Sequence, residues 1–298
     1  MSEENFKGFI GGRHAERVTS IHTQEQVRAE SEQYPAISEK GVDATRERSL
    51  DVKKTLEHAP KGTVFFFGGT SEEQRTKSTY DVYGDTLRSL YAGDKDTLVF
   101  THREIDALHD EKRGVANTVR AIEVFIAQHP DKKVLIVYPL FLKEFSLRPD
   151  FRGKEAPYHL TRYSNALQPG GSAEHEAVEA LMRSDGIEVA EDGSIALGPT
   201  ALDVAKKYLV GIKRLREFAQ EYAPSRPVMV GFVSHGLILD ALTSYLANQG
   251  APNVAAFKET GGKMIQSSEI GTVTIENGEA TFEYHDKKYH VNPVLLNA

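Results

Sequence analysis

Arginine and histidine residues stand directly after three apolar, strand-like segments of the sequence. Arg13, His14 and Arg17 follow the first segment, His235 ends another, and Arg75 comes shortly after a third. A guanidinium group matches the oxygens of a phosphate in forked geometry, and an imidazole can act as a nucleophile or as a proton carrier. If these side chains meet at one point, they form a binding site for a phosphate group.

The apolar segments predict buried strands of a parallel sheet, because their apolar residues are continuous rather than alternating. They span residues 6–10, 63–68, 96–100, 133–141 and 227–235. Segments with helical patterning lie between them, at residues 38–59, 115–129, 200–222 and 237–250. Residues 270–285 alternate in polarity around Asn277-Gly278, which is typical of a β-hairpin.

The alternation of strands and helices predicts one domain over residues 1–298, a doubly wound α/β fold with three layers, α/β/α, and a mostly parallel sheet. Ligands of such sheets bind outside the carboxyl ends of the strands. We therefore expect the arginines and histidines to line one crevice. Residues 143–199 interrupt the pattern with a polar, turn-rich stretch, which we interpret as a cap-like insertion in the domain.

Each of these residues also has an ordinary structural explanation. A single histidine at a strand end is more often structural than catalytic, residues 13–17 could form a salt-bridged loop, and Arg75 could lie on a solvated helix face. Their joint occurrence at the strand ends of one α/β chain is what favours a common site.

The composition limits the classes of function. No apolar stretch reaches the roughly 18 residues of a membrane span, and no signal peptide is indicated. The absence of cysteine excludes disulfides and thiolate chemistry and fits a cytoplasmic protein. A net charge of −7 argues against general nucleic-acid binding. The histidines show no metal-ligand spacing, so we expect no metal ion and no other cofactor.

The chain resembles the histidine phosphatase superfamily, which has the phosphoglycerate mutase-like fold. The Arg-His-Gly or Arg-His-Ala marker of that family is matched by Arg13-His14-Ala15, and its Ser/Thr-His-Gly marker by Ser234-His235-Gly236. Looser matches to a helix start and to a turn before a helix lie between them: Ile37, Ser38, Gly41 and Ala44, then Ser71, Arg75 and Thr79. The matches run in the order of the family over residues 6–285.

The resemblance implies a role for each residue. His14 would attack phosphorus and carry a phosphohistidine intermediate. Arg13, Arg17, Arg75 and His235 would hold the phosphoryl oxygens and stabilise the charge of the transition state. The expected partner of the site is a phosphorylated substrate.

A leaving alkoxide needs a proton, which the family takes from a carboxylic acid in a later segment. The segment "REIDALHD" lies at the corresponding place, and by resemblance we assign the acid to Glu104, with Asp106 as the alternative. Both could instead be surface carboxylates. Glu72 stands where the family usually has proline, and we expect its carboxylate to point away from a bound phosphate.

The reaction implied is metal-independent hydrolysis of a phosphomonoester of a small molecule or a protein. A phosphoglycerate mutase-type phosphotransferase is the alternative within the superfamily, although the insertion does not show the substrate-loop residues of a mutase. A non-catalytic phosphate-ester binding protein is a second alternative, which the intact set of arginines and histidines disfavours. The insertion could hold a second anionic group or be a solvated loop, since it is basic: Lys143, Arg148, Arg152, Lys154 and Arg162.

Overall fold

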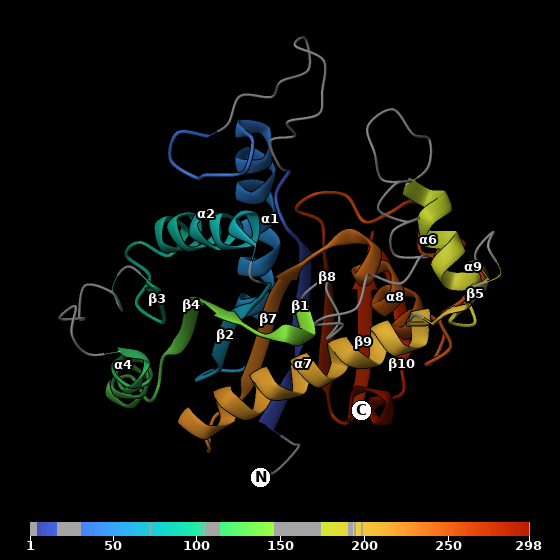
Figure 1. Ribbon diagram of the computed structural model, residues 1–298. Coiled ribbons are helices and arrows are strands. Elements are labelled where there is room, and N and C mark those ends of the chain that lie inside the picture. Colours follow the sequence, from blue (N-terminus) through green and yellow to red (C-terminus); the bar gives the residue numbers. More distant parts are fainter. Residues whose placement is uncertain are drawn as a thin grey trace.

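The computed structural model describes residues 5–16, 31–71, 73–102, 104, 114–145, 174–189, 193, 195–197 and 199–297. Within these ranges the predicted three-layer α/β/α architecture is confirmed, around an eight-stranded, mostly parallel sheet (Figure 1). The strands follow the order β10-β9-β8-β1-β7-β2-β4-β3 across the sheet. A separate pair, β5 and β6, forms a small second sheet.

The parallel part of the main sheet contains β1 (Phe6–Arg13), β7 (Val228–Ser234), β2 (Val64–Thr70), β4 (Lys133–Phe141) and β3 (Thr97–Thr101). Antiparallel strands extend it beyond β1, in the order β8 (Ile270–Glu276), β9 (Glu279–Tyr284) and β10 (Lys287–Val291). The predicted hairpin at Asn277-Gly278 is confirmed, and both turn residues have positive φ, 52° and 82°. β10 has no counterpart in the sequence-based prediction.

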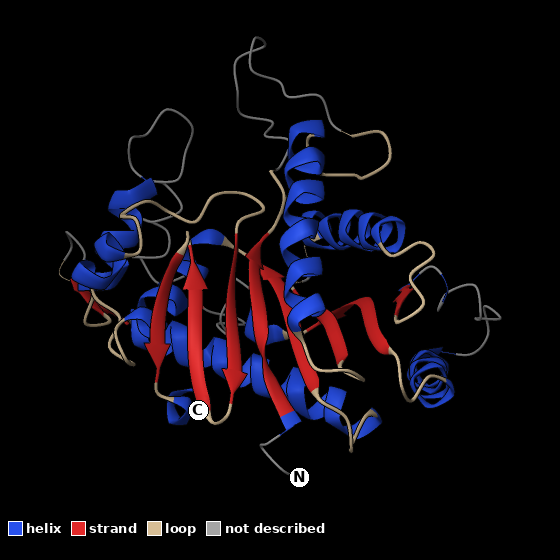
Figure 2. Cartoon of the chain, turned by 180° about the vertical axis from the view of Figure 1, so that it is seen from behind, coloured by secondary structure: helices blue, strands red, loops and turns tan. Residues whose placement is uncertain are grey.

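Helices cover both faces of the sheet. One face, which Figure 2 brings forward, packs against α1 (Glu39–His58) and α2 (Gln74–Leu90). The other packs against α4 (Gly114–Gln128), α7 (Ala201–Tyr222) and α8 (Gly236–Ala247). Successive residues of β2 alternate between the two cores, Phe65 and Phe67 toward α1 and Phe66 toward α7. Burial on both faces explains why the strands are continuously apolar.

Side-chain caps fix the predicted starts of two helices. Ser38 is the N-cap of α1, and its hydroxyl accepts a hydrogen bond from the Gly41 amide at 3.1 Å. Thr200 and Asp203 form the predicted capping box of α7. Such caps satisfy amides that have no partner within the helix and so define the residue at which each helix begins.

The described part of the predicted insertion contains regular structure. It includes the 3₁₀ turn η3 (Lys143–Phe145), α6 (Glu174–Arg183), β5 (Ile187–Val189) and β6 (Ile195–Leu197). α6 packs against α8 and against α9 (Val254–Glu259) through a small apolar cluster. Four of the five basic residues noted above lie outside the described residues, so the cap remains a prediction: Arg148, Arg152, Lys154 and Arg162.

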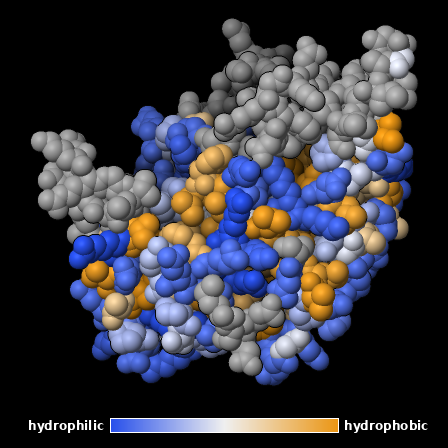
Figure 3. All heavy atoms as spheres, turned by 60° about the horizontal axis from the view of Figure 1, so that its bottom comes forward, coloured by the Kyte–Doolittle hydropathy of each residue, from blue (hydrophilic) through white to orange (hydrophobic). Residues whose placement is uncertain are grey.

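Apolar side chains are dispersed over the visible surface. In Figure 3 the apolar residues are interspersed with polar ones on the side that is brought forward. The large exposed apolar side chains of the described ranges come from different elements: Leu50, Val124, Phe141, Ile187, Val210 and Val294. None of the described helices combines the length and the apolar character that a bilayer crossing requires.

Candidate active site

His14 and His235 lie side by side at the carboxyl edge of the sheet because their strands are paired in register. Arg13 at the end of β1 is opposite Ser234 at the end of β7, and the His14 amide donates to the Ser234 carbonyl at 2.9 Å. The next residue of each strand is a histidine, and the two rings meet edge to face with centroids 5.1 Å apart. Both side chains are buried.

Hydrogen bonding fixes the tautomer of His14. Its Nδ1 lies 2.6 Å from the Ala15 carbonyl oxygen, which can only accept, so Nδ1 carries the proton. Nε2 therefore keeps its lone pair and is the nucleophilic nitrogen. Burial lowers the pKa of His14 well below its ordinary value, and the positive charges of Arg75 and Arg13 lower it further. The imidazole is thus neutral at neutral pH.

Arg75 joins the two histidines from the first turn of α2. Its Nη2 lies 3.3 Å from Nδ1 of His235 and must be the donor, since a guanidinium has no acceptor. Nε2 of His235 then carries a proton and donates to the Ser71 hydroxyl at 3.2 Å. Nη2 of Arg75 is also 3.0 Å from Oε2 of Glu73. The Arg75 side chain is only 12% exposed, so the guanidinium is held within the edge of the sheet.

The Arg13 guanidinium approaches the same edge beside α8. Its Nη1 donates to the Ile265 carbonyl. Gly236 is required here, because a Cβ at that position would lie 3.1 Å from Cζ of Arg13 and 2.9 Å from Met264. The glycine of the Ser-His-Gly match therefore lets an arginine pack against the N-terminus of α8. That helix end adds a partial positive charge to the edge.

Motif residues also hold the loop after β1 in place. The Ala15 amide donates to the Thr79 hydroxyl of α2 at 2.9 Å, and the Ser38 amide donates to the Glu16 carbonyl at 2.8 Å. Gly41 permits this close approach, since a Cβ there would lie 2.8 Å from the Glu16 backbone. The loop that carries His14 is thus attached to both α1 and α2.

The cluster is suited to an anion rather than a cation. It combines two permanent cations, Arg13 and Arg75, with an imidazole N–H and a helix N-terminus, all of which are donors or positive poles. Among the described residues, no group of three or more histidine, aspartate or glutamate side chains lies together in a way that could hold a metal ion. The arrangement can bind a phosphate and present it to Nε2 of His14.

Four predicted site residues meet in this way: Arg13, His14, Arg75 and His235. Arg17 and Asp106 lie outside the described residues, as does Glu72. Their roles therefore remain predictions from the sequence.

Glu104 is not brought to this cluster. β4 lies between β2 and β3, so β3 is four strand positions from β1, about 19 Å at the usual spacing. The registers also place Thr101 level with Ile10, four residues before His14. The Glu104 carboxylate accepts from the Thr101 amide at 2.9 Å and pairs with Arg88 at 2.8 Å. Its assignment as the acid stays a prediction from the resemblance.

Among the described residues, Glu73 supplies a carboxylate that contacts the cluster, and the sequence-based prediction does not include it. The sequence carries a signal for it, because two acidic residues, Glu72 and Glu73, stand in the segment where the resembled family usually has proline. The contact of Arg13 with the carbonyl of Ile265 has no such signal, because no side-chain motif reveals a backbone acceptor.

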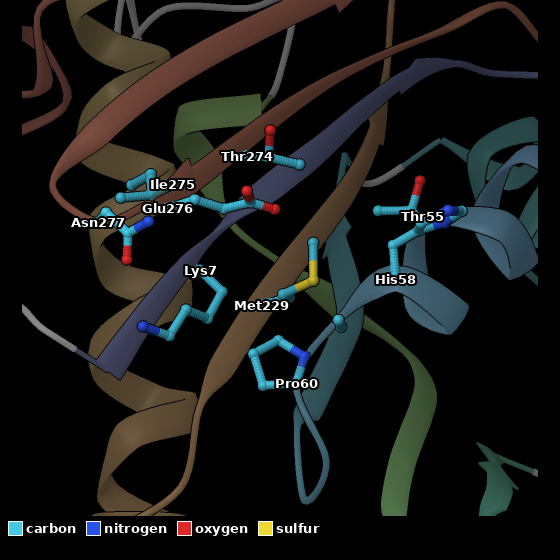
Figure 4. A pocket seen from close by; sticks show the side chains of 10 residues that line it. Lys7, Thr55, His58, Pro60, Met229, Thr274, Ile275, Glu276 and Asn277 are labelled. Carbon is cyan, nitrogen blue, oxygen red and sulfur yellow. The ribbon is translucent and has the colours of Figure 1, made fainter.

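A cavity of about 290 Å³ lies at the opposite edge of the sheet (Figure 4). Its lining includes Lys7 and Met229, which stand at the amino ends of β1 and β7, and His58 at the end of α1. Lys7 and Arg13 are six residues apart on β1, about 20 Å along an extended strand. The cavity therefore takes no part in the cluster around His14.

Comparison with known proteins gives no match by sequence, since no family model and no curated protein matches the chain. Solved structures with similar chains include phosphatases and a phosphoglycerate mutase. Mycobacterial glucosyl-3-phosphoglycerate phosphatase, in complex with VO3, is 15% identical with a TM-score of 0.42, over 90% of this chain and 92% of that chain. Phosphoserine phosphatase from Entamoeba histolytica is 11% identical with a TM-score of 0.39, over 92% of this chain and 94% of that chain.

Phosphoglycerate mutase from Bacillus anthracis is 12% identical with a TM-score of 0.37, over 94% of this chain and 93% of that chain.

Proposed function

We propose that this chain is a histidine phosphatase, which hydrolyses phosphomonoesters without a metal ion through a phosphohistidine at His14. The observation that carries the proposal is the state of His14: a buried, neutral imidazole with its proton fixed on Nδ1 and its Nε2 lone pair retained. A histidine with a purely structural role does not require two arginines and a second histidine around it. A nucleophile for a phosphate does.

In the first chemical step, Nε2 of His14 attacks phosphorus and forms a P–N bond. The ester P–O bond breaks, its electron pair goes to the leaving oxygen, and that oxygen takes a proton from a carboxylic acid. Arg13, Arg75 and the N–H of His235 bind the equatorial phosphoryl oxygens, where charge accumulates. The hydrogen bond from Nδ1 to the Ala15 carbonyl stabilises the positive charge that develops on the ring.

In the second step, water attacks phosphorus and the P–N bond breaks, so that its electron pair returns to Nε2 of His14. The proton of the water goes to the carboxylate that served as the acid. Inorganic phosphate is then bound by the same arginines. The two steps balance without a metal ion and without any other cofactor.

The proposal is tested with p-nitrophenyl phosphate in the presence and absence of EDTA. We expect equal release of nitrophenolate in both, together with an acid-labile, base-stable phosphoenzyme after rapid quenching, as a phosphohistidine requires. Turnover that EDTA abolishes would contradict the metal-independent mechanism. Phosphoryl transfer that depends on a bisphosphate primer would favour the mutase alternative, and tight phosphate binding with no turnover would favour the binding protein.

A further inference from the structure

The carboxylate of Glu73 contacts the Arg75 guanidinium. Its Oε2 is 3.0 Å from Nη2 of Arg75, the same nitrogen that contacts His235 at 3.3 Å. Glu73 is the N-cap residue of α2, yet its side chain makes no capping hydrogen bond with the helix. The side chain is directed to Arg75 instead.

The exposures of the side chains indicate on which side of the site a leaving group fits. In phosphoryl transfer the nucleophile and the leaving oxygen lie roughly in line on opposite sides of phosphorus. His14 is 5% exposed, so a phosphate on Nε2 must place its leaving group toward solvent. The Glu73 side chain is 41% exposed, whereas that of Arg75 is 12% exposed. Glu73 is thus the more accessible partner of this ion pair, as a group that reaches a leaving oxygen on the solvent side needs to be.

The geometry points to Glu73 as the general acid that protonates the leaving oxygen, an inference that rests on the proposed function. As Nε2 of His14 forms its bond to phosphorus and the P–O bond breaks, the Glu73 carboxyl gives its proton to the departing oxygen. In the second step the resulting carboxylate takes a proton from the attacking water. This assigns to Glu73 the role that the resemblance assigns to Glu104.

Substrate binding changes the contacts of Glu73. A bound phosphate dianion takes over Nη2 of Arg75, which leaves the Glu73 carboxyl free to face the leaving oxygen.

The test compares Glu73→Gln with wild type on two substrates, p-nitrophenyl phosphate and a simple alkyl phosphate. Nitrophenolate leaves readily without a proton, whereas an alkoxide does not. We expect kcat/KM, which reports on the step in which the leaving group departs, to fall by roughly 100-fold or more for the alkyl phosphate, within the usual range for an acid catalyst, and to change less than about fivefold for the aryl phosphate. Retained turnover of the aryl phosphate also shows that the variant is folded and that the His14 chemistry is intact.

The matched control is Glu57→Gln, which removes an exposed carboxylate paired with Lys53 at the far end of α1 and should change neither rate.

Three outcomes would overturn the inference. One is an equal effect of Glu73→Gln on kcat/KM for both substrates. Another is a lower KM for both substrates at unchanged kcat, which would mean that Glu73 only competes with phosphate for Arg75. The third is a leaving-group dependence produced by Glu104→Gln and not by Glu73→Gln. If the wild-type protein turns over neither substrate, the proposed function itself is refuted.

Discussion

Arg226 and Arg75 lie at opposite edges of the same sheet and have contrasting partners. The Arg226 guanidinium, just before β7, donates to four backbone carbonyls, those of Gly62, Ile126, His129 and Lys132, at 2.5 to 3.2 Å. Two of these carbonyls lie just before β2 and β4, so the arginine connects the starts of three parallel strands. The Arg75 guanidinium contacts the side chains of His235 and Glu73.

The type of partner distinguishes a structural arginine from a functional one. Backbone carbonyls cannot move away without unfolding, so the donors of Arg226 are committed to the fold. The partners of Arg75 are side chains that can rotate, and a phosphate can replace them with oxygens of matching geometry. β7 connects the two edges, with Arg226 just before its first residue and His235 just after its last. The following variants test whether stability and activity divide between the edges in this way.

The largest effect on activity is expected from His14→Ala. Without Nε2 no covalent intermediate can form, and kcat should fall by roughly 10⁴- to 10⁶-fold, as for loss of other enzymatic nucleophiles. Steady-state rates and the quenched phosphoenzyme are the measurements. A variant that keeps near-native turnover would mean that the reaction does not pass through His14.

Arg75→Ala should lose rate but retain stability. Removal of one preorganised donor for transition-state charge costs roughly 100- to 1000-fold in kcat. Orthovanadate, which mimics five-coordinate phosphorus, should inhibit this variant much more weakly than wild type. The free energy of unfolding should change by about 1 kcal/mol or less, because the lost ion pair with Glu73 is partly exposed. Equal vanadate inhibition of both proteins would place Arg75 outside the site.

Arg226→Ala should show the opposite behaviour. It leaves four carbonyls without their charged donor, which should lower the free energy of unfolding by about 2–4 kcal/mol in denaturant titration. Below its unfolding transition the variant should keep the kcat of wild type. Arg226→Lys is an intermediate control. It keeps the positive charge, but one ammonium group cannot donate to four carbonyls as the planar guanidinium does. A rate loss as large as that of Arg75→Ala would remove the distinction between the two edges.

The fold was predictable because its periodic signals are local. Continuous apolar runs mark strands buried on both faces, and caps such as Ser38 and Thr200 mark helix starts, so the three layers follow from the sequence. Strand order is not local. β4 lies between β2 and β3 although it follows β3 in the sequence, and this order depends on contacts between segments that are far apart along the chain.

Because the strand order could not be predicted, only part of the candidate site could be predicted. The residues that directly follow β1 and β7 could be placed together from the sequence, because the carboxyl ends of neighbouring parallel strands share an edge. Glu104 also follows a strand, but its distance from His14 is set by the strands inserted between them. The contact of Glu73 with Arg75 depends on side-chain direction at a helix start, which sequence spacing does not specify.

The smallest effect concerns pH and again involves His14. Its pKa in the folded protein lies well below the ordinary value, because the ring is buried beside cations, whereas the unfolded chain titrates near 6.5. Between these two pKa values the unfolded state binds more protons, so stability rises with pH in this window and is lost as the pH falls below about 6.5. Denaturant titrations of wild type and His14→Ala from pH 7.5 to 5.5 measure the contribution of His14 to the pH dependence of the free energy of unfolding. The other histidines contribute equally to both proteins and cancel in the comparison. The wild type should lose more stability than the variant as the pH falls through this window, and parallel curves would show that His14 is not held neutral by its surroundings.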